Sequence, residues 1–226
     1  MSTASNSADG PAPDTTDPAR PVTKRSAAKA ARRAELLTAA ARQMAERGFA
    51  GVRLEDIGGA AGVSGPAMYR HFASKVELLD EMLLDISRRL HDGGAAVVDQ
   101  GLPAAQTLDA LIAFHIDVLV TKPDLIAVQD RDLTSMTPDA NHEVRRLQRL
   151  YVERWVDVVL ALSAENDEIP LHRDEARVRV HAMFGLLNSS PRLPAFPADR
   201  LRQLLSAMAL AALRVPSAGM SENPDC

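Results

Sequence analysis

The side chains best suited to chemistry in this 226-residue chain gather between Ser64 and Lys75. Arg70 carries a guanidinium, which can bind a guanine edge through two hydrogen bonds or pair with a phosphate. Pro66 and Ala67, just before it, can offer only apolar contacts, for example to a thymine methyl group. What these side chains can contact depends on whether a rigid element presents them together.

Two short helices separated by a glycine are predicted to present them. Before the break, apolar residues share one helical face, and Gly62 ends the segment. A second helix begins near Pro66, which suits a first helical turn, with Ser64 or Gly65 as its cap. A helix, a short turn containing glycine and a second helix form the helix-turn-helix pattern, whose second helix enters the major groove. The residues predicted to form the core of the pair are Leu54, Ile57, Val63, Met68 and Phe72.

The pattern A-G-V-S-x-x-x-x-Y-x-H-F-x-S-K-x-x-L-L, from Ala61 to Leu79, resembles the DNA-binding signature of the TetR family of one-component transcriptional regulators. It follows a helix that ends in Glu-Arg-Gly-Phe at 46–49, as that family expects. The resemblance implies that Tyr69, His71 and Lys75 hold phosphates, and so set register more than sequence preference.

Three positions depart from the family pattern. Val52 and Arg53 stand where a capping Thr or Ser is common, so Arg53 takes over the phosphate contact while the cap is missing. Gly58 and Gly59 lie inside the first helix of the pair, where each costs about 1 kcal/mol relative to alanine, and a looser head is expected. Residues 65–67 replace the commoner Lys-Gly-Thr, which removes a cation and a hydroxyl.

The charge distribution divides the chain into a basic segment and an acidic remainder. The net charge is −4, but residues 20–75 carry +7 and residues 76–226 carry −8. A basic segment on an acidic body is typical of a DNA-binding module joined to a second domain. The cations from Arg20 to Arg33, among them Lys24 and Arg25, follow one another without an acid. They form either an arm that reaches a minor groove or phosphates, or a solvated lead-in to the first helix.

Cysteine usage and hydropathy argue against secretion and membrane insertion. The only cysteine is Cys226, so no disulfide can form within the chain. The first residues lack the apolar core of a signal peptide, and no apolar run reaches the roughly 18 residues that span a bilayer. We therefore expect a cytoplasmic protein with no membrane partner.

Helical spacing of apolar residues continues to residue 214, without strand alternation or an internal repeat. It predicts an all-α fold of about nine helices, in which the helix after Lys75 fades near Gly93 and Gly94. We expect a disordered tail (1–25), a helix-turn-helix DNA-binding head (26–75), a helical body (76–214) and a C-terminal tail (215–226). Residues 167–170 are expected to end the long helix of the body.

The family resemblance implies that the body binds a small ligand and dimerises through its last two helices, so that the dimer faces a palindromic operator. The broad apolar face of residues 201–213 supports a homodimer. Candidate ligand contacts are His115, Gln129, Trp155, Phe184 and Asn188, each of which could instead be a core or interface residue. Segments at 115–118, 128–132 and 184–191 are also similar to TetR-type regulators of acyl-CoA or branched-chain catabolism. Together with the low aromatic content of 4%, this favours an acyl-CoA or another aliphatic effector.

Other classes of function are less compatible with the sequence. We find no catalytic motif, no metal-ligand spacing among the dispersed histidines and no sign of a cofactor, so no enzyme is expected. An architectural or effector-independent DNA-binding protein remains open, as does a helical interaction protein that has lost DNA binding.

Overall fold

The computed structural model describes residues 24–165, 171–193 and 196–214, and within these ranges the chain is helical, without a β-strand. Both tails, the segment 167–170 and Cys226 lie outside the described residues, apart from the first helical positions at 24 and 25. The all-α prediction is confirmed. The elements in chain order are α1 (Lys24–Arg47), α2 (Leu54–Ala60), α3 (Gly65–Met68), α4 (Lys75–Val98), α5 (Ala104–Thr121), α6 (Pro123–Asp132), the 3-10 turn η1 (Leu133–Ser135), α7 (Pro138–Glu165), α8 (Arg173–Asn188), the 3-10 turn η2 (Ser190–Arg192) and α9 (Ala198–Leu213).

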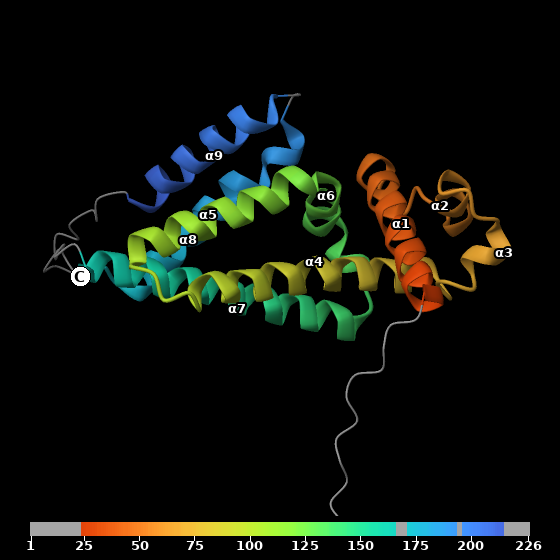
Figure 1. The fold of residues 1–226 in the computed structure, drawn as a ribbon, viewed down its shortest axis with the longest axis horizontal. Helices are drawn as coiled ribbons and strands as arrows, with labels where there is room; N and C mark the ends of the chain where they lie inside the picture. Colours follow the sequence, from red (N-terminus) through yellow and green to blue (C-terminus); the bar gives the residue numbers. More distant parts are fainter. Residues whose placement is uncertain (1–23, 166–170, 194–195, 215–226) are drawn as a thin grey trace, which may run out of the picture.

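The long helix α4 joins the two parts of the molecule. Figure 1 shows α1, α2 and α3 gathered at one end of α4, while α5, α6 and α7 pack along the rest of it, and α8 and α9 pack on α7 and α5. α4 contacts α1 in the head and α5, α6 and α7 in the body. The predicted domain boundary at residue 75 coincides with the start of this helix. It stays a prediction, because α4 packs on both parts.

The head folds around the apolar residues that periodicity assigns to its core. Met68 and Phe72 are fully buried, as is Ile57 of α2. They belong to one cluster with Leu36 and Met44 of α1, which are also fully buried. This packing fixes α3 relative to α1, and so decides which side chains near α3 face outward.

Gly58 of α2 lies against α3 and the turn that joins the two helices. A Cβ at this position would lie 2.4 Å from Met68 Cγ and 2.9 Å from the carbonyl oxygen of Val63. Gly62 then turns the chain with a φ of +67°, a conformation that favours glycine. Gly58 is therefore required by packing and is not a source of looseness, whereas a Cβ at Gly59 would meet no atom within 4 Å.

The expected end of α4 near Gly93 and Gly94 is wrong, because the helix continues to Val98. A Cβ at Gly93 would lie 2.2 Å from Phe114 Cζ, and one at Gly94 would lie 2.4 Å from Tyr151 Cε2. The two glycines thus let an aromatic ring of α5 and one of α7 pack directly on α4.

α5 is long and apolar enough to cross a membrane by length and composition, yet half of it is buried inside the bundle. It packs against α4, α7 and α9. Its exposed Asp117 pairs with Arg202 of α9 at 3.0 Å. These contacts are those of the core helix of a bundle.

Candidate functional site

The predicted recognition helix is short and continues as a turn. α3 covers only Gly65–Met68, with Ser64 as its N-cap and Pro66 in its first turn. The backbone N–H of Arg70 donates to the carbonyl of Ala67 at 3.2 Å, and the N–H of His71 to that of Met68 at 2.8 Å, so the helical path extends further. Among the predicted DNA contacts in this segment, Ser64, Pro66, Tyr69 and Arg70 are exposed, while Gly65, Ala67, His71 and Lys75 are half-buried.

Arg53 and Arg70 are the predicted contacts with uncommitted charges. Both side chains are exposed, and neither has an ion pair or hydrogen bond among the described residues. The charge of Arg53 adds to the effect of the Tyr69 hydrogen bond in lowering the pKa of Glu55. Arg53 is the N-cap of α2, and its backbone N–H donates to Asp56 Oδ2 at 3.2 Å. Asp56 thus supplies half of a capping box where the expected Thr or Ser is missing. Both guanidinium groups remain available for a phosphate or a base.

Tyr69 is committed to a neighbour within the head. Its Oη donates to Glu55 Oε1 at 2.6 Å. This hydrogen bond lowers the pKa of Glu55 and raises the pKa of Tyr69. Because the hydroxyl has a single proton, Tyr69 must exchange Glu55 for a phosphate oxygen before it can donate to DNA.

Lys75 is the first residue of α4, and its side chain binds the connection between α1 and α2. Its Nζ donates to the carbonyls of Phe49 at 2.7 Å and Val52 at 2.8 Å, and lies 4.2 Å from the centre of the Phe49 ring. An ammonium group has three donors, so one remains for the predicted phosphate contact. Lys75 therefore also positions the head on α4, a role that the sequence did not reveal.

Two arginines of the predicted basic arm hold α1 in place. Arg33 pairs with Glu81 of α4, donates to the carbonyl of His71 and lies 4.1 Å from the centre of the Phe72 ring. Arg32 donates to the carbonyl of Ala61 at 2.7 Å. These two side chains are therefore neither a free arm nor a solvated lead-in.

Lys24 and Arg25 lie in the first turn of α1, and their side chains are outside the described part of the chain. Their contact with DNA therefore stays a prediction.

The imidazole of His71 has a buried Nδ1 without a hydrogen-bond partner in the described ranges.

Three of the five candidate ligand contacts meet in a buried aromatic cluster, formed by His115 of α5, Trp155 of α7 and Phe184 of α8. Tyr151 of α7 completes it, with its Oη 3.3 Å from His115 Nδ1. The ring centre of Phe184 lies 4.9 Å from that of His115 and 5.2 Å from that of Trp155. Burial lowers the pKa of His115 to about 4, an effect that Asn188 partly opposes. Burial also raises the pKa of Tyr151.

The other candidates differ from this group. Gln129 of α6 lies apart from the cluster and donates from Nε2 to Ser87 Oγ at 3.0 Å, which is the arrangement of a satisfied core residue. Asn188 ends α8, is half-buried and lies close enough to His115 to hydrogen-bond with it, which is how it opposes the lowering of the His115 pKa by burial. Within the cluster, His115 Nε2 and Trp155 Nε1 are buried without a partner in the described residues. Tyr151 was expected only as a core residue, and its position four residues before Trp155 was the signal for its membership.

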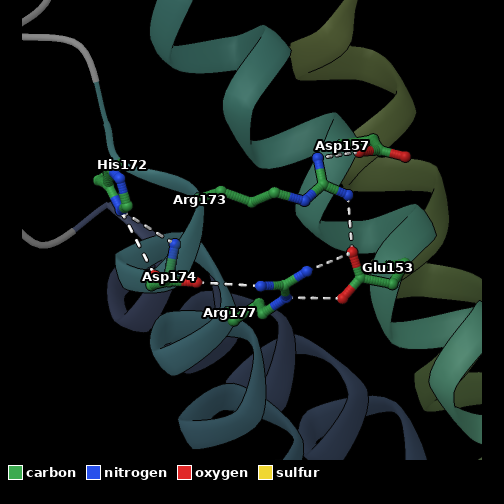
Figure 2. A network of polar contacts seen from close by, with 6 residues as sticks. All are labelled: Glu153, Asp157, His172, Arg173, Asp174 and Arg177. Carbon is green, nitrogen blue, oxygen red and sulfur yellow. Dashed lines mark hydrogen bonds and ion pairs between the residues drawn. The ribbon is translucent and has the colours of Figure 1, made fainter.

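An ion-pair network holds the start of α8 on α7 (Figure 2). Glu153 accepts hydrogen bonds from Arg177 Nε at 2.7 Å and Arg173 Nη2 at 2.6 Å, and Arg173 also pairs with Asp157 at 2.8 Å. The two guanidinium groups, Arg177 first, lower the pKa of Glu153 to about 2. The network fixes the orientation of α8.

In the part of the chain that is described, no group of three or more His, Cys, Asp or Glu side chains could hold a metal ion.

Comparison with known proteins agrees with this architecture. Residues 36–82 match the model for bacterial regulatory proteins of the tetR family, and residues 101–192 match the tetracyclin repressor-like C-terminal domain. The HTH-type transcriptional repressor KstR2 of Rhodococcus jostii is 31% identical over 136 residues, which are 59% of this chain. The alignment spans 66% of that relative, just under two thirds of its length.

Solved structures share the fold at lower identity. KstR2 of Mycobacterium tuberculosis, a ketosteroid transcriptional regulator, has a TM-score of 0.70 at 24% identity, covering 80% of this chain and 93% of that one. AibR, solved with isovaleryl coenzyme A and operator DNA, has a TM-score of 0.63 at 17% identity, covering 78% and 97%. The helix-turn-helix head, the helical body and the two family matches together identify this chain as a member of the TetR family of bacterial regulatory proteins.

Proposed function

We propose that the protein binds a palindromic operator as a homodimer and is released from it by a small-molecule effector, which makes it a repressor. The observation that carries the DNA-binding part is the pair of uncommitted guanidinium groups, Arg53 and Arg70, exposed at the end of the molecule that α2 and α3 form. An exposed cation with no internal partner gains most from a phosphate or a guanine edge.

Residues 26–75 would serve as the DNA-binding domain, with α3 in the major groove. Arg70 would bind a guanine or a phosphate, and Pro66 and Ala67 would contact apolar base edges. The backbone at Ser64 and Gly65, together with Tyr69, His71, Lys75, Lys24 and Arg25, would set the register through the phosphates and the adjacent groove. Such contacts make affinity depend strongly on salt.

Residues 76–214 would serve for dimerisation and effector binding. Leu204 and Met208 of α9 are 50% and 41% exposed, and Val178 of the neighbouring α8 is 68% exposed. Large apolar side chains left in water on adjacent helices favour a second copy of the chain as their cover. A two-fold dimer would place its two recognition helices about 34–36 Å apart, one helical turn of DNA.

The effector is proposed to be an acyl-CoA or another aliphatic compound. AibR is a regulator of the same fold that binds isovaleryl coenzyme A. His115, Trp155, Phe184 and Asn188 are among the ligand contacts that the sequence predicts, and they lie together in the body. Gln129 has the weakest support, because Ser87 already accepts its hydrogen bond.

An effector-independent DNA-binding protein is the second candidate. The four rings of the aromatic cluster lie between 4.9 and 6.1 Å apart, centre to centre, so they occupy the space a ligand would need there. In that case no small molecule would change the affinity for DNA. Either candidate acts on chromosomal DNA, for which we infer a cytoplasmic location.

The test is fluorescence anisotropy with labelled DNA from the protein's own upstream region, at two salt concentrations, with and without acyl-CoA thioesters. We expect tight binding that weakens with salt and is released by one thioester. Tight binding that no small molecule releases would favour the effector-independent protein. If upstream DNA does not bind, selection from random-sequence DNA follows, and the absence of any selected site would contradict DNA binding altogether.

A further inference from the structure

A cavity of about 380 Å³ lies between the head and the body, and no residue of the aromatic cluster lines it. We call it the seam cavity. One wall is α1, with Leu37 and Ala41, and the opposite wall is α4, with Met82 and Ile86. The end of α5 and the first turn of α6, which includes Leu125, close the third side. The size is within the range of ordinary small-molecule sites, and the aliphatic walls suit a hydrocarbon chain.

Two cations stand on the lining of the seam cavity without internal partners. The side chains of Arg89 on α4 and Lys122 before α6 have no ion pair or hydrogen bond within the described ranges. Two carboxylates also line it. Asp85 lies 3.8 Å from Arg88, and burial raises its pKa, while Asp124 lies in the first turn of α6. Asp124 has no ion pair within the described ranges either, so the four formal charges on the lining balance. Arg89 and Lys122 are the two lining groups that could pair with the anionic head of a ligand.

The position of the seam cavity couples it to the head. α6 also contacts the far end of α1, where Arg131 donates to the carbonyls of Met44 and Ala45. A molecule wedged between α1 and the start of α6 therefore acts on the same packing that orients the head. Any change in the angle between head and body changes the separation of the two recognition helices in a dimer.

We propose that the seam cavity is the site of the effector, and that it takes an aliphatic chain with an anionic head group paired to Arg89 and Lys122. This inference rests on the proposed function, and it places the effector outside the aromatic cluster. A free fatty acid and an acyl-CoA share this chemistry. In the second case the nucleotide would extend from the open side of the cavity, where Ala34 and Thr38 of α1 are exposed.

The experiment is calorimetric titration of the full chain with octanoate and with octanoyl-CoA, with octanol as the uncharged probe. Ala34→Leu fills the open side, while Arg89→Ala and Lys122→Ala remove the cations. Ala161→Leu, on the lining of a separate cavity in the body, and Arg149→Ala, an exposed cation on α7, are the matched controls. Trp155→Phe reports on the aromatic cluster, because it removes the unpartnered N–H and keeps a ring.

At least one anionic probe should bind the wild type more tightly than octanol. Each cation variant should weaken that binding about tenfold, the loss of one charge-assisted hydrogen bond, and Ala34→Leu should abolish it. The controls and Trp155→Phe should bind as the wild type does. The probe with the higher affinity, octanoate or octanoyl-CoA, identifies the natural form of the ligand.

Failure of the inference and failure of the proposed function are separable, because operator binding is measured on the same variants by anisotropy. If a thioester releases the wild type and Ala34→Leu equally, the effector binds elsewhere and the inference is wrong, while the function stands. A loss of binding in Trp155→Phe alone would assign the effector to the cluster. No binding of either anionic probe to the wild type would also overturn the inference.

Discussion

Arg131 of α6 donates a hydrogen bond to the backbone carbonyl of Met44, in the last turn of α1. The same guanidinium donates to the carbonyl of Ala45 at 3.2 Å and is oriented by Asp132. The carbonyl of Met44 also accepts from the backbone N–H of Gly48 at 2.8 Å, so Arg131 is its second donor. A cation at this end of α1 also meets the negative end of the helix dipole. The body thus holds the C-terminal end of the first head helix by a charged side chain.

Arg131→Ala should uncouple the effector from the operator. Without the Arg131 hydrogen bonds to the end of α1, a movement of α6 is no longer transmitted to α1. The ratio of operator affinities without and with effector should therefore approach one. Coupling between sites in regulators is typically 5–150-fold, which is about the range to be lost. Anisotropy titrations with and without effector measure the ratio. The control is Arg145→Ala, at an exposed arginine whose hydrogen bond goes to Asn141 within α7. An unchanged ratio in Arg131→Ala would show that the Arg131 hydrogen bonds do not couple the two sites.

Gly58 and Gly59 should respond oppositely to alanine. Gly58→Ala places a methyl group against Met68 and the Val63 carbonyl, and should destabilise the protein by about 1–3 kcal/mol. Gly59→Ala meets open space and should stabilise it by up to about 1 kcal/mol. Urea unfolding of the two variants gives both values. Equal effects would mean that the close packing of α2 on α3 does not exist in solution.

Glu55→Gln should strengthen operator binding. The substitution removes a negative charge from the DNA-facing side of the head and weakens the hold on the Tyr69 hydroxyl, which then donates to a phosphate at lower cost. The expected result is a severalfold lower dissociation constant by anisotropy. Glu46→Gln, which removes an exposed carboxylate paired with Arg42 on α1, controls for net charge. Equal gains in both variants would show a general charge effect and leave the Tyr69 contact without support.

His115 should make the protein less stable in acid. Its pKa is about 4 in the folded chain and 6.5 when exposed, so the unfolded state binds more protons between these values. Stability is therefore complete above pH 6.5 and falls as the pH drops toward 4, by up to roughly 3 kcal/mol. His115→Phe should lose less stability over this window than the wild type, as measured by urea unfolding at each pH. His142→Gln, at an exposed histidine, should match the wild type, and the same pH dependence in His115→Phe would contradict the assignment.

Much of the fold follows from the sequence because helix formation is local. Apolar periodicity, Ser64 and Ser74 as N-caps and Gly62 at the turn predict the helix-turn-helix pair, and all of them are present. Gly93 and Gly94 mislead for a tertiary reason. Their lack of a side chain accommodates rings from α5 and α7, and no local pattern reveals a partner so far along the chain.

The sequence predicts which side chains could contact DNA, but it does not reveal the contacts that those side chains make within the protein. Arg70 and Arg53 are exposed as expected, whereas Lys75, Arg33 and Tyr69 are engaged by carbonyls or carboxylates from other elements. A sequence pattern identifies a charge but not the group that neutralises it. The seam cavity was missed for the same reason, since its walls come from three separate segments.

The most direct test compares Arg70→Ala with the wild type on one operator fragment at two salt concentrations, with circular dichroism as the check on folding. Loss of a base contact should weaken binding by about 1–3 kcal/mol, roughly ten- to hundredfold, while the helical spectrum stays the same. If Arg70 contacts a phosphate instead, the slope of the logarithm of the binding constant against the logarithm of salt concentration should also fall by about one, because one fewer counterion is released. Unchanged affinity at both salt concentrations would contradict the account, because its principal uncommitted cation would then play no part in binding DNA.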